Sequence, residues 1–165
     1  MEDRQGLERA YADPHSTYVA GDTLYVAGTK FDGPRDVWDD LKIPFGLTGR
    51  SQRYEDASRV LKAMPQIRRI VGHSLGGAVA LELQKNHPEL KSVTYSAPLF
   101  TASAGERYKT VLDPIAMFDV GATTTVQRGL NPHSYQHIAN RFHAFAHGTS
   151  ENGYSNADGS SSLYR

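Results

Sequence analysis

The chain has 165 residues, enough for one domain with a single buried core, and 39% of them are hydrophobic. Its 18 basic and 18 acidic residues balance, so charge favours neither a nucleic acid nor an anionic membrane as a partner. The absence of cysteine excludes disulfides, thiolate metal sites and a cysteine nucleophile. The sequence shows neither a signal peptide nor an apolar run of about 20 residues, so we expect the protein in the cytoplasm or within a larger assembly.

Three short elements are predicted before residue 30. Residues 5–11 fit one or two helical turns, and the runs at 18–20 and 24–27 flank a Gly-Asp-Thr turn as the two strands of a β-hairpin do. Residues 1–16 are interpreted as a segment that precedes the main domain. Residues 31–49 are richer in Gly, Pro and Asp, and we expect them to form mostly loop.

The pattern changes after residue 53. The elements predicted there are a helix ending at Pro65, a strand at 67–71, a helix at 75–86, and strands at 92–97 and 108–112. Strands that alternate with helices in this order need crossover connections, which favour a mainly parallel central sheet with helices on both faces. We therefore predict one α/β domain over residues 17–147, followed at 148–165 by a flexible polar tail rich in Gly and Ser.

The segment IRRIVGHSLGGAVALEL carries the candidate chemistry, because it contains a G-x-S-x-G pentapeptide at 72–76. A serine hydroxyl is a weak nucleophile unless it is exposed, held in position and met by a base. A sharp turn from strand to helix holds it, and glycine at 72 and 76 keeps side chains away from the neighbouring strand and helix. Ser74 then lies at a helix N-terminus, where the amide of Leu75 points toward a developing oxyanion. The alternative interpretation is a glycine-rich turn without chemistry.

The same segment resembles the nucleophile segment of the class 3 lipases, the fungal triacylglycerol-lipase type of α/β-hydrolase. Upstream, LYVAGTK followed by DVWDDLK resembles the oxyanion segment of that family, and downstream RYKTVLDPIAMF resembles the strand that ends in its catalytic aspartate. The three motifs follow the family's order and cover residues 18–137. The resemblance implies a compact, lidless α/β-hydrolase that cleaves carboxylic esters of lipids through an acyl-enzyme, as a lipase, phospholipase or esterase. It implies that the reaction needs neither a cofactor nor a metal. It also implies that the protein contacts a membrane surface transiently to reach its ester substrate.

Carried over by position, the resemblance assigns the remaining roles in the site. Thr29 would supply a second oxyanion amide beside that of Leu75. Asp113 would orient the base and stabilise the imidazolium, with Asp119 as the alternative acid. An Asp followed by Pro also often does no more than begin a turn.

The base is the least determined member of the triad. Four histidines follow Asp113 and fit the chain order Ser, Asp, His: His133, His137, His143 and His147. We favour His133, in the loop-like segment NPHSY, and take His137 as the alternative base. The two i, i+4 spacings among these histidines also suit a zinc site on a helix, but no Glu stands beside the first histidine of either pair and no metalloprotease pattern appears. His73 is expected to pack beneath the turn and not to act as the base.

The chain departs from the class 3 pattern in three places. It leaves little room for a lid helix between Thr29 and residue 53, Ala27 stands where an arginine is common, and no His-x-Gly-Phe segment precedes the next helix. These departures bear on interfacial activation and on a preference for triglycerides, and they leave Ser74 untouched. Two other functions fit the same residues: a catalytically silent scaffold that serves as a binding or assembly module, and acyl-transfer or thioesterase chemistry with the same nucleophile.

Overall fold

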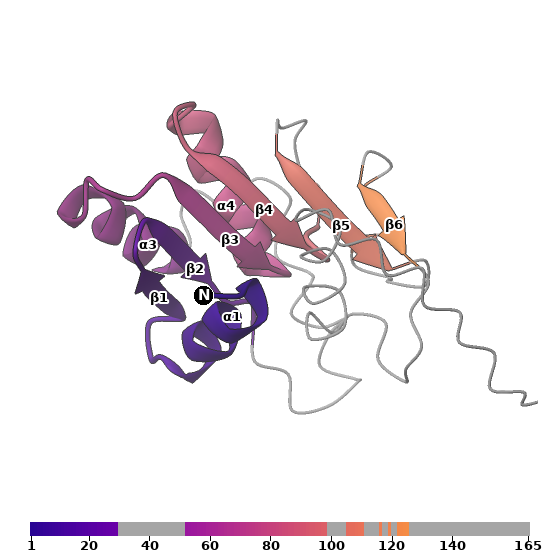
Figure 1. The fold of residues 1–165 in the computed structure, drawn as a ribbon, viewed down its shortest axis with the longest axis horizontal. Helices are drawn as coiled ribbons and strands as arrows, with labels where there is room; N and C mark the ends of the chain where they lie inside the picture. Colours follow the sequence, from indigo (N-terminus) through magenta and orange to yellow (C-terminus); the bar gives the residue numbers. More distant parts are fainter. Residues whose placement is uncertain (30–51, 99–104, 111–115, 117–118, 120–121, 126–165) are drawn as a thin grey trace, which may run out of the picture.

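The computed structural model describes residues 1–29, 52–98, 105–110, 116, 119 and 122–125 (Figure 1). Its elements are, in chain order, α1 (Asp3–Ala12), β1 (Thr17–Ala20), β2 (Thr23–Val26), α3 (Gln52–Ala63), β3 (Arg69–His73), α4 (Leu75–Asn86), β4 (Lys91–Tyr95), β5 (Glu106–Thr110) and β6 (Thr123–Thr125). The helices and strands predicted within these residues are all present, with ends that differ by no more than two residues. The loop predicted at 31–49 and the tail predicted at 148–165 lie outside the described residues.

The strands of the described part form one six-stranded sheet in the order β1-β2-β3-β4-β5-β6. β1 and β2 are antiparallel, with Gly21 at a φ of 59° in the turn between them, and every later pair is parallel. The predicted hairpin and the mainly parallel sheet are therefore confirmed. Because neighbouring parallel strands end on the same side, the last residues of β2, β3, β4 and β5 lie along one edge, here called the carboxyl edge (Figure 1).

β4 ends two residues earlier than predicted, and the cause is the backbone conformation of the next residue. The strand predicted to reach residue 97 stops at Tyr95, because Ser96 has a φ of 52° and leaves the extended conformation. The Ser96 amide still donates a hydrogen bond to the carbonyl of Tyr108 on the neighbouring β5, at 2.7 Å. The end of β4 is thus held against β5 at the carboxyl edge.

Helices cover both faces of the sheet, and the alternation of side chains along β2 shows how. Leu24 and Val26 face the cluster built with α3 and α4, which also contains Ala57, Ile70, Val79, Ala80 and Leu83. Tyr25 and Ala27 face the cluster built with α1, which also contains Leu7, Ala10, Val71, Val93 and Tyr95. Alternate residues of a strand point to opposite faces, so the same strand anchors both layers. The prediction of an α/β arrangement with helices on both faces is confirmed (Figure 1).

α1 is fixed to the sheet by an ion pair between its first residue, the buried Asp3, and the half-buried Arg69 of β3. Both carboxylate oxygens of Asp3 accept hydrogen bonds from the guanidinium of Arg69, each at 2.7 Å, and one also accepts the phenol of Tyr95 at 2.7 Å. Burial and the Asp3 carboxylate raise the pKa of Tyr95, so its hydroxyl remains a proton donor. Further along α1, Gly6 lies on the ring of Tyr25, where a Cβ would come within 2.2 Å of a ring carbon. α1 therefore packs against one face of the sheet and its buried residues form part of the core.

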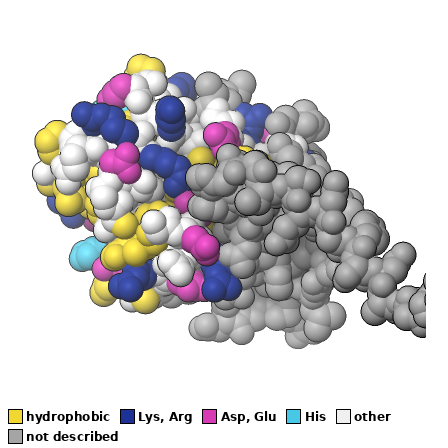
Figure 2. Space-filling model, viewed as in Figure 1, with side chains coloured by type: hydrophobic (Ala, Val, Ile, Leu, Met, Phe, Trp, Pro, Cys, Tyr) yellow, Lys and Arg dark blue, Asp and Glu magenta, His cyan; other side chains and the backbone are white. Residues whose placement is uncertain are grey.

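Charge does not single out one region of the visible surface. Figure 2 shows basic and acidic side chains interspersed over the described part of this face, so neither sign dominates it. None of the helices in the described ranges is long and apolar enough to cross a membrane.

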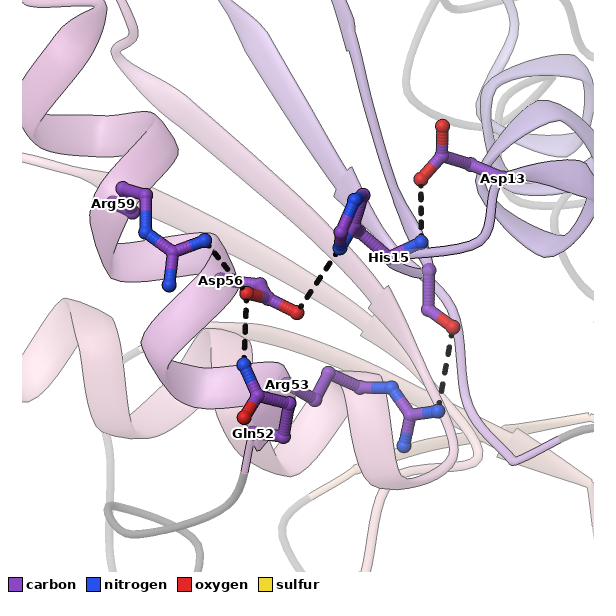
Figure 3. A network of polar contacts seen from close by, with 7 residues as sticks. Asp13, His15, Gln52, Arg53, Asp56 and Arg59 are labelled. Atoms are coloured by element: carbon purple, nitrogen blue, oxygen red, sulfur yellow. Dashed lines mark hydrogen bonds and ion pairs between the residues drawn. The ribbon is translucent and has the colours of Figure 1, made fainter.

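A polar network joins the start of α3 to the turn that follows α1 (Figure 3). At its centre is Asp56, 6% exposed, which accepts hydrogen bonds from Gln52 at 3.1 Å and Arg59 at 2.9 Å and lies 3.6 Å from the ring of His15. Burial raises the pKa of Asp56, but these two hydrogen bonds and the charges of Arg59 and His15 outweigh it, so the pKa lies below its ordinary value. Beside it, Arg53 donates a long hydrogen bond, 3.4 Å, to the hydroxyl of Ser16.

Asp56→Asn is expected to lower the free energy of unfolding by about 1 kcal/mol near neutral pH, because the partner Arg59 is itself largely exposed. A carboxylate with a lowered pKa in the fold stabilises the protein above its unfolded-state pKa, and the contribution is lost as the pH falls through the folded-state value. The advantage of the wild type over the variant should therefore shrink below about pH 4. Urea unfolding at a series of pH values measures this difference. Glu55→Gln, an exposed change on the same helix, is the control and should show no such convergence. An advantage of the wild type over Asp56→Asn that is constant with pH would contradict the prediction.

Candidate active site

Ser74 is the single residue between the last residue of β3 and the first residue of α4. Its φ of 54° and ψ of −128° fall in a region that residues with a side chain rarely adopt, at a cost of about 1–3 kcal/mol. The backbone holds it there from both sides. The Ser74 amide donates to the carbonyl of Tyr95 on β4 at 3.0 Å, and the Ser74 carbonyl accepts from the amides of Gly77 and Ala78 at 2.8 and 3.2 Å. The predicted sharp turn from strand to helix is confirmed.

The glycines of the pentapeptide are required by close approaches of backbone to backbone. A Cβ on Gly72 would lie 2.3 Å from the carbonyl oxygen of Gly76, and a Cβ on Gly76 would lie 2.2 Å from the carbonyl oxygen of Val26. Neither contact can be relieved by rotating a side chain, because the obstacle is backbone. With glycine at both positions, β2, β3 and α4 can therefore lie closer together than any residue with a Cβ at 72 or 76 would allow.

The end of β2 lies directly against the serine. A Cβ on Gly28 would come within 2.7 Å of the Cβ of Ser74 and 2.9 Å of the carbonyl oxygen of His73. Thr29, the predicted oxyanion donor, is the next residue and is half-buried. Leu75, the other predicted donor, is the first residue of α4, where backbone N–H groups have no partner within the helix. The structure thus brings Ser74 together with both segments expected to hold an oxyanion.

Ser74 is more enclosed than the sequence suggests. Only 4% of the surface of the whole residue is exposed. The close approach of Gly28 is one physical reason, since it leaves no space beside the Ser74 Cβ.

His73 packs beneath the turn, as expected, and is 5% exposed. Its Nδ1 lies 2.6 Å from the hydroxyl of Tyr11, near the end of α1, and the two rings are tilted with centroids 5.9 Å apart. The same hydroxyl accepts a hydrogen bond from the amide of Gly28 at 3.1 Å. Sequence reasoning missed Tyr11, since no motif includes it. The one available signal was its spacing from Leu7 and Ala10, which places all three near one face of a helix.

Asp113, His133 and His137 lie outside the described residues, as do His143 and His147. β5 ends at Thr110, at the carboxyl edge that also carries Ser74, and Asp113 follows three residues later in the sequence. Their roles in a triad therefore remain predictions from the sequence.

The alternative acid, Asp119, has a partner. It is 2% exposed, and one carboxylate oxygen accepts a hydrogen bond from the Nε of Arg107 on β5 at 3.0 Å. Its other carboxylate oxygen, Oδ1, is buried without a hydrogen-bond partner among the described residues, so the contact with Arg107 satisfies only half of the carboxylate and Asp119 stays the alternative acid. Among the described residues, no group of three or more His, Asp or Glu side chains could hold a metal ion.

Comparison with protein-family models, with curated proteins and with solved structures gives no match to this chain. The functional interpretation therefore depends on the motifs of the sequence and on the geometry around Ser74.

Proposed function

We propose that this protein is a serine hydrolase with an α/β-hydrolase fold, which cleaves carboxylic esters of lipids. The observation that carries the proposal is the conformation of Ser74, a residue with a side chain held at a φ of 54° between a parallel strand and a helix. Strained backbone of this kind persists where the surrounding structure enforces it, and it is concentrated at functional sites. A glycine at this position would adopt the same backbone without strain, so the hydroxyl is the feature that a serine adds.

The proposed reaction proceeds through an acyl-enzyme. His133 accepts the proton of Ser74 while the Ser74 oxygen attacks the acyl carbonyl, and Asp113 holds the imidazole in the required tautomer. The amides of Thr29 and Leu75 stabilise the oxyanion of the tetrahedral intermediate. That intermediate collapses, the leaving alcohol takes the proton from the imidazolium, and an ester of Ser74 is left. Water, deprotonated by the same histidine, then hydrolyses this ester and restores the serine.

The resemblance to class 3 lipases supports a lipid ester as the substrate, such as a phospholipid or a monoglyceride. It also supports transient contact with a membrane surface during turnover. A panel of p-nitrophenyl esters of increasing acyl length, tested beside phospholipid vesicles, would identify the substrate class. Thioesters in the same panel test acyl-transfer or thioesterase chemistry by the same nucleophile.

One observation favours a second candidate function. Ser74 is 4% exposed, and a nucleophile that never becomes accessible would leave the protein a silent scaffold for binding or assembly. A fluorophosphonate probe separates the two functions, because it reacts with an activated and accessible serine. We expect covalent labelling of the wild type at Ser74, located by mass spectrometry of the labelled peptide, and none in Ser74→Ala. A folded wild-type protein that resists the probe and every ester would favour the scaffold.

A further inference from the structure

The hydroxyl of Tyr11 lies between two groups that flank the proposed nucleophile. It is 2.6 Å from Nδ1 of His73, the residue before Ser74, and 3.1 Å from the amide of Gly28, the residue before Thr29. We propose that Tyr11 is a positioning residue of the active site, which fixes the oxyanion segment relative to the nucleophile turn. This inference rests on the proposed function of Ser74.

The chemistry of the groups fixes the direction of one of these two hydrogen bonds. The Gly28 amide can only donate, so the phenol oxygen accepts from it. The 2.6 Å hydrogen bond between the phenol and Nδ1 of His73 runs in the direction that the tautomer of the imidazole sets. With either tautomer, one hydroxyl joins the Gly28 amide to the ring of His73.

The space around Gly28 explains why a positioning group matters here. A Cβ on Gly28 would lie 2.7 Å from the Cβ of Ser74 and 2.8 Å from the Tyr11 hydroxyl, so the segment is confined between them. Thr29 follows directly, and its amide must meet an oxyanion that forms on the carbon attacked by Ser74. An oxyanion donor displaced by about 1 Å can cost about a hundredfold in rate. A hydroxyl that fixes the Gly28 amide therefore sets where the next amide lies.

α1 gives Tyr11 a rigid support. Its first turn is tied to β3 and β4 through Asp3, Arg69 and Tyr95, and its middle is filled by Leu7 and Ala10, both fully buried. Tyr11 stands at the other end of the same helix, one residue before its last residue. The N-terminal helix is thus fixed to β3 and β4 at one end and carries Tyr11 near its other end.

Tyr11→Phe tests the inference, because it removes the hydroxyl and keeps the ring. We expect kcat per labelled Ser74 to fall about tenfold or more while KM changes little, since a donor for the transition state is misplaced and substrate binding is not. Counting sites with the fluorophosphonate probe corrects for any misfolded fraction. Tyr54→Phe is the matched control. Its hydroxyl accepts a hydrogen bond from Asn86, the last residue of α4 and the end farthest from Ser74, and kcat should be unchanged.

A purely structural hydroxyl would lower the melting temperature of Tyr11→Phe and leave kcat per labelled site at the wild-type value, and that result would overturn the inference. If the variant does not fold, incorporation of 3,5-difluorotyrosine at position 11 keeps the hydroxyl and lowers the pH at which it ionises. The fluorines also make the phenol oxygen a weaker acceptor for the Gly28 amide, so kcat per labelled Ser74 should fall below the wild-type value at a pH where the phenol keeps its proton, whereas an unchanged kcat would overturn the inference. A wild type that neither labels nor cleaves any ester would overturn the proposed function itself, a result distinct from both.

Discussion

Replacing Ser74 by alanine is expected to lower ester turnover by about 10⁶-fold, the loss seen when a nucleophile is removed from related triads. In the proposed mechanism the substitution removes the oxygen that forms the acyl-enzyme, so the residual rate would come from substrate binding and oxyanion stabilisation. We expect the loss to appear as a fall in kcat, with little change in KM. Steady-state kinetics with a p-nitrophenyl ester measures both constants.

Ser92→Ala is the matched control for this substitution. Ser92 is also buried, on β4, and its hydroxyl donates a hydrogen bond of 2.6 Å to Gln84 of α4. Its loss should cost about 1 kcal/mol of stability and leave kcat near the wild-type value. Turnover that survives Ser74→Ala within about tenfold would assign the hydrolysis to another residue or to a contaminant.

Gly76→Ala is expected to destabilise the fold by about 3 kcal/mol or more, at the upper end of what overpacking costs. The added methyl group would lie 2.2 Å from the carbonyl oxygen of Val26, the last residue of β2, and 2.6 Å from that of Ala27, the residue after it. α4 must therefore move away from β2, which also displaces the turn that holds Ser74. Chemical denaturation gives the loss of stability, and turnover of the fraction that remains folded should fall as well.

Gly21→Ala separates crowding from the general cost of replacing glycine. Gly21 has a φ of 59°, but no atom lies within 4 Å of an added Cβ, so the cost is limited to the backbone strain of about 1–2 kcal/mol. Activity should persist in this variant. Equal losses of stability in the two variants would show that the contact of Gly76 with β2 has little energetic weight.

The local elements of this fold could be predicted because each depends on residues close together in the sequence. The helix at 75–86 was predicted with the bounds that the structure gives, since the glycine turn starts it and His87-Pro88 ends it. The parallel sheet followed from the alternation of strands and helices. Gly72 and Gly76 could be assigned a steric role from the pentapeptide alone, and the backbone contacts confirm that role.

Contacts between distant residues could not be predicted in this way. Tyr11 and His73 are 62 positions apart, and Asp3 and Arg69 are 66 positions apart, so no local pattern points to either pair. The enclosure of Ser74 is of the same kind, since it depends on how closely the end of β2 approaches β3. A motif indicates which residue types a site needs, but it does not determine how distant parts of the chain pack against those residues.

The order of the strands bears on how this protein is made. Among the strands of the described residues, each one after β1 pairs with the strand that precedes it in the chain, so its partner has already been synthesised when it leaves the ribosome. α1 leaves the ribosome before any of the sheet that it will cover, and its apolar residues must wait until β2, β3 and β4 have followed. The carboxylate of Asp3 must wait until Arg69, 66 positions later at the start of β3, has been synthesised, so this ion pair closes only after the β1–β2 hairpin has left the ribosome.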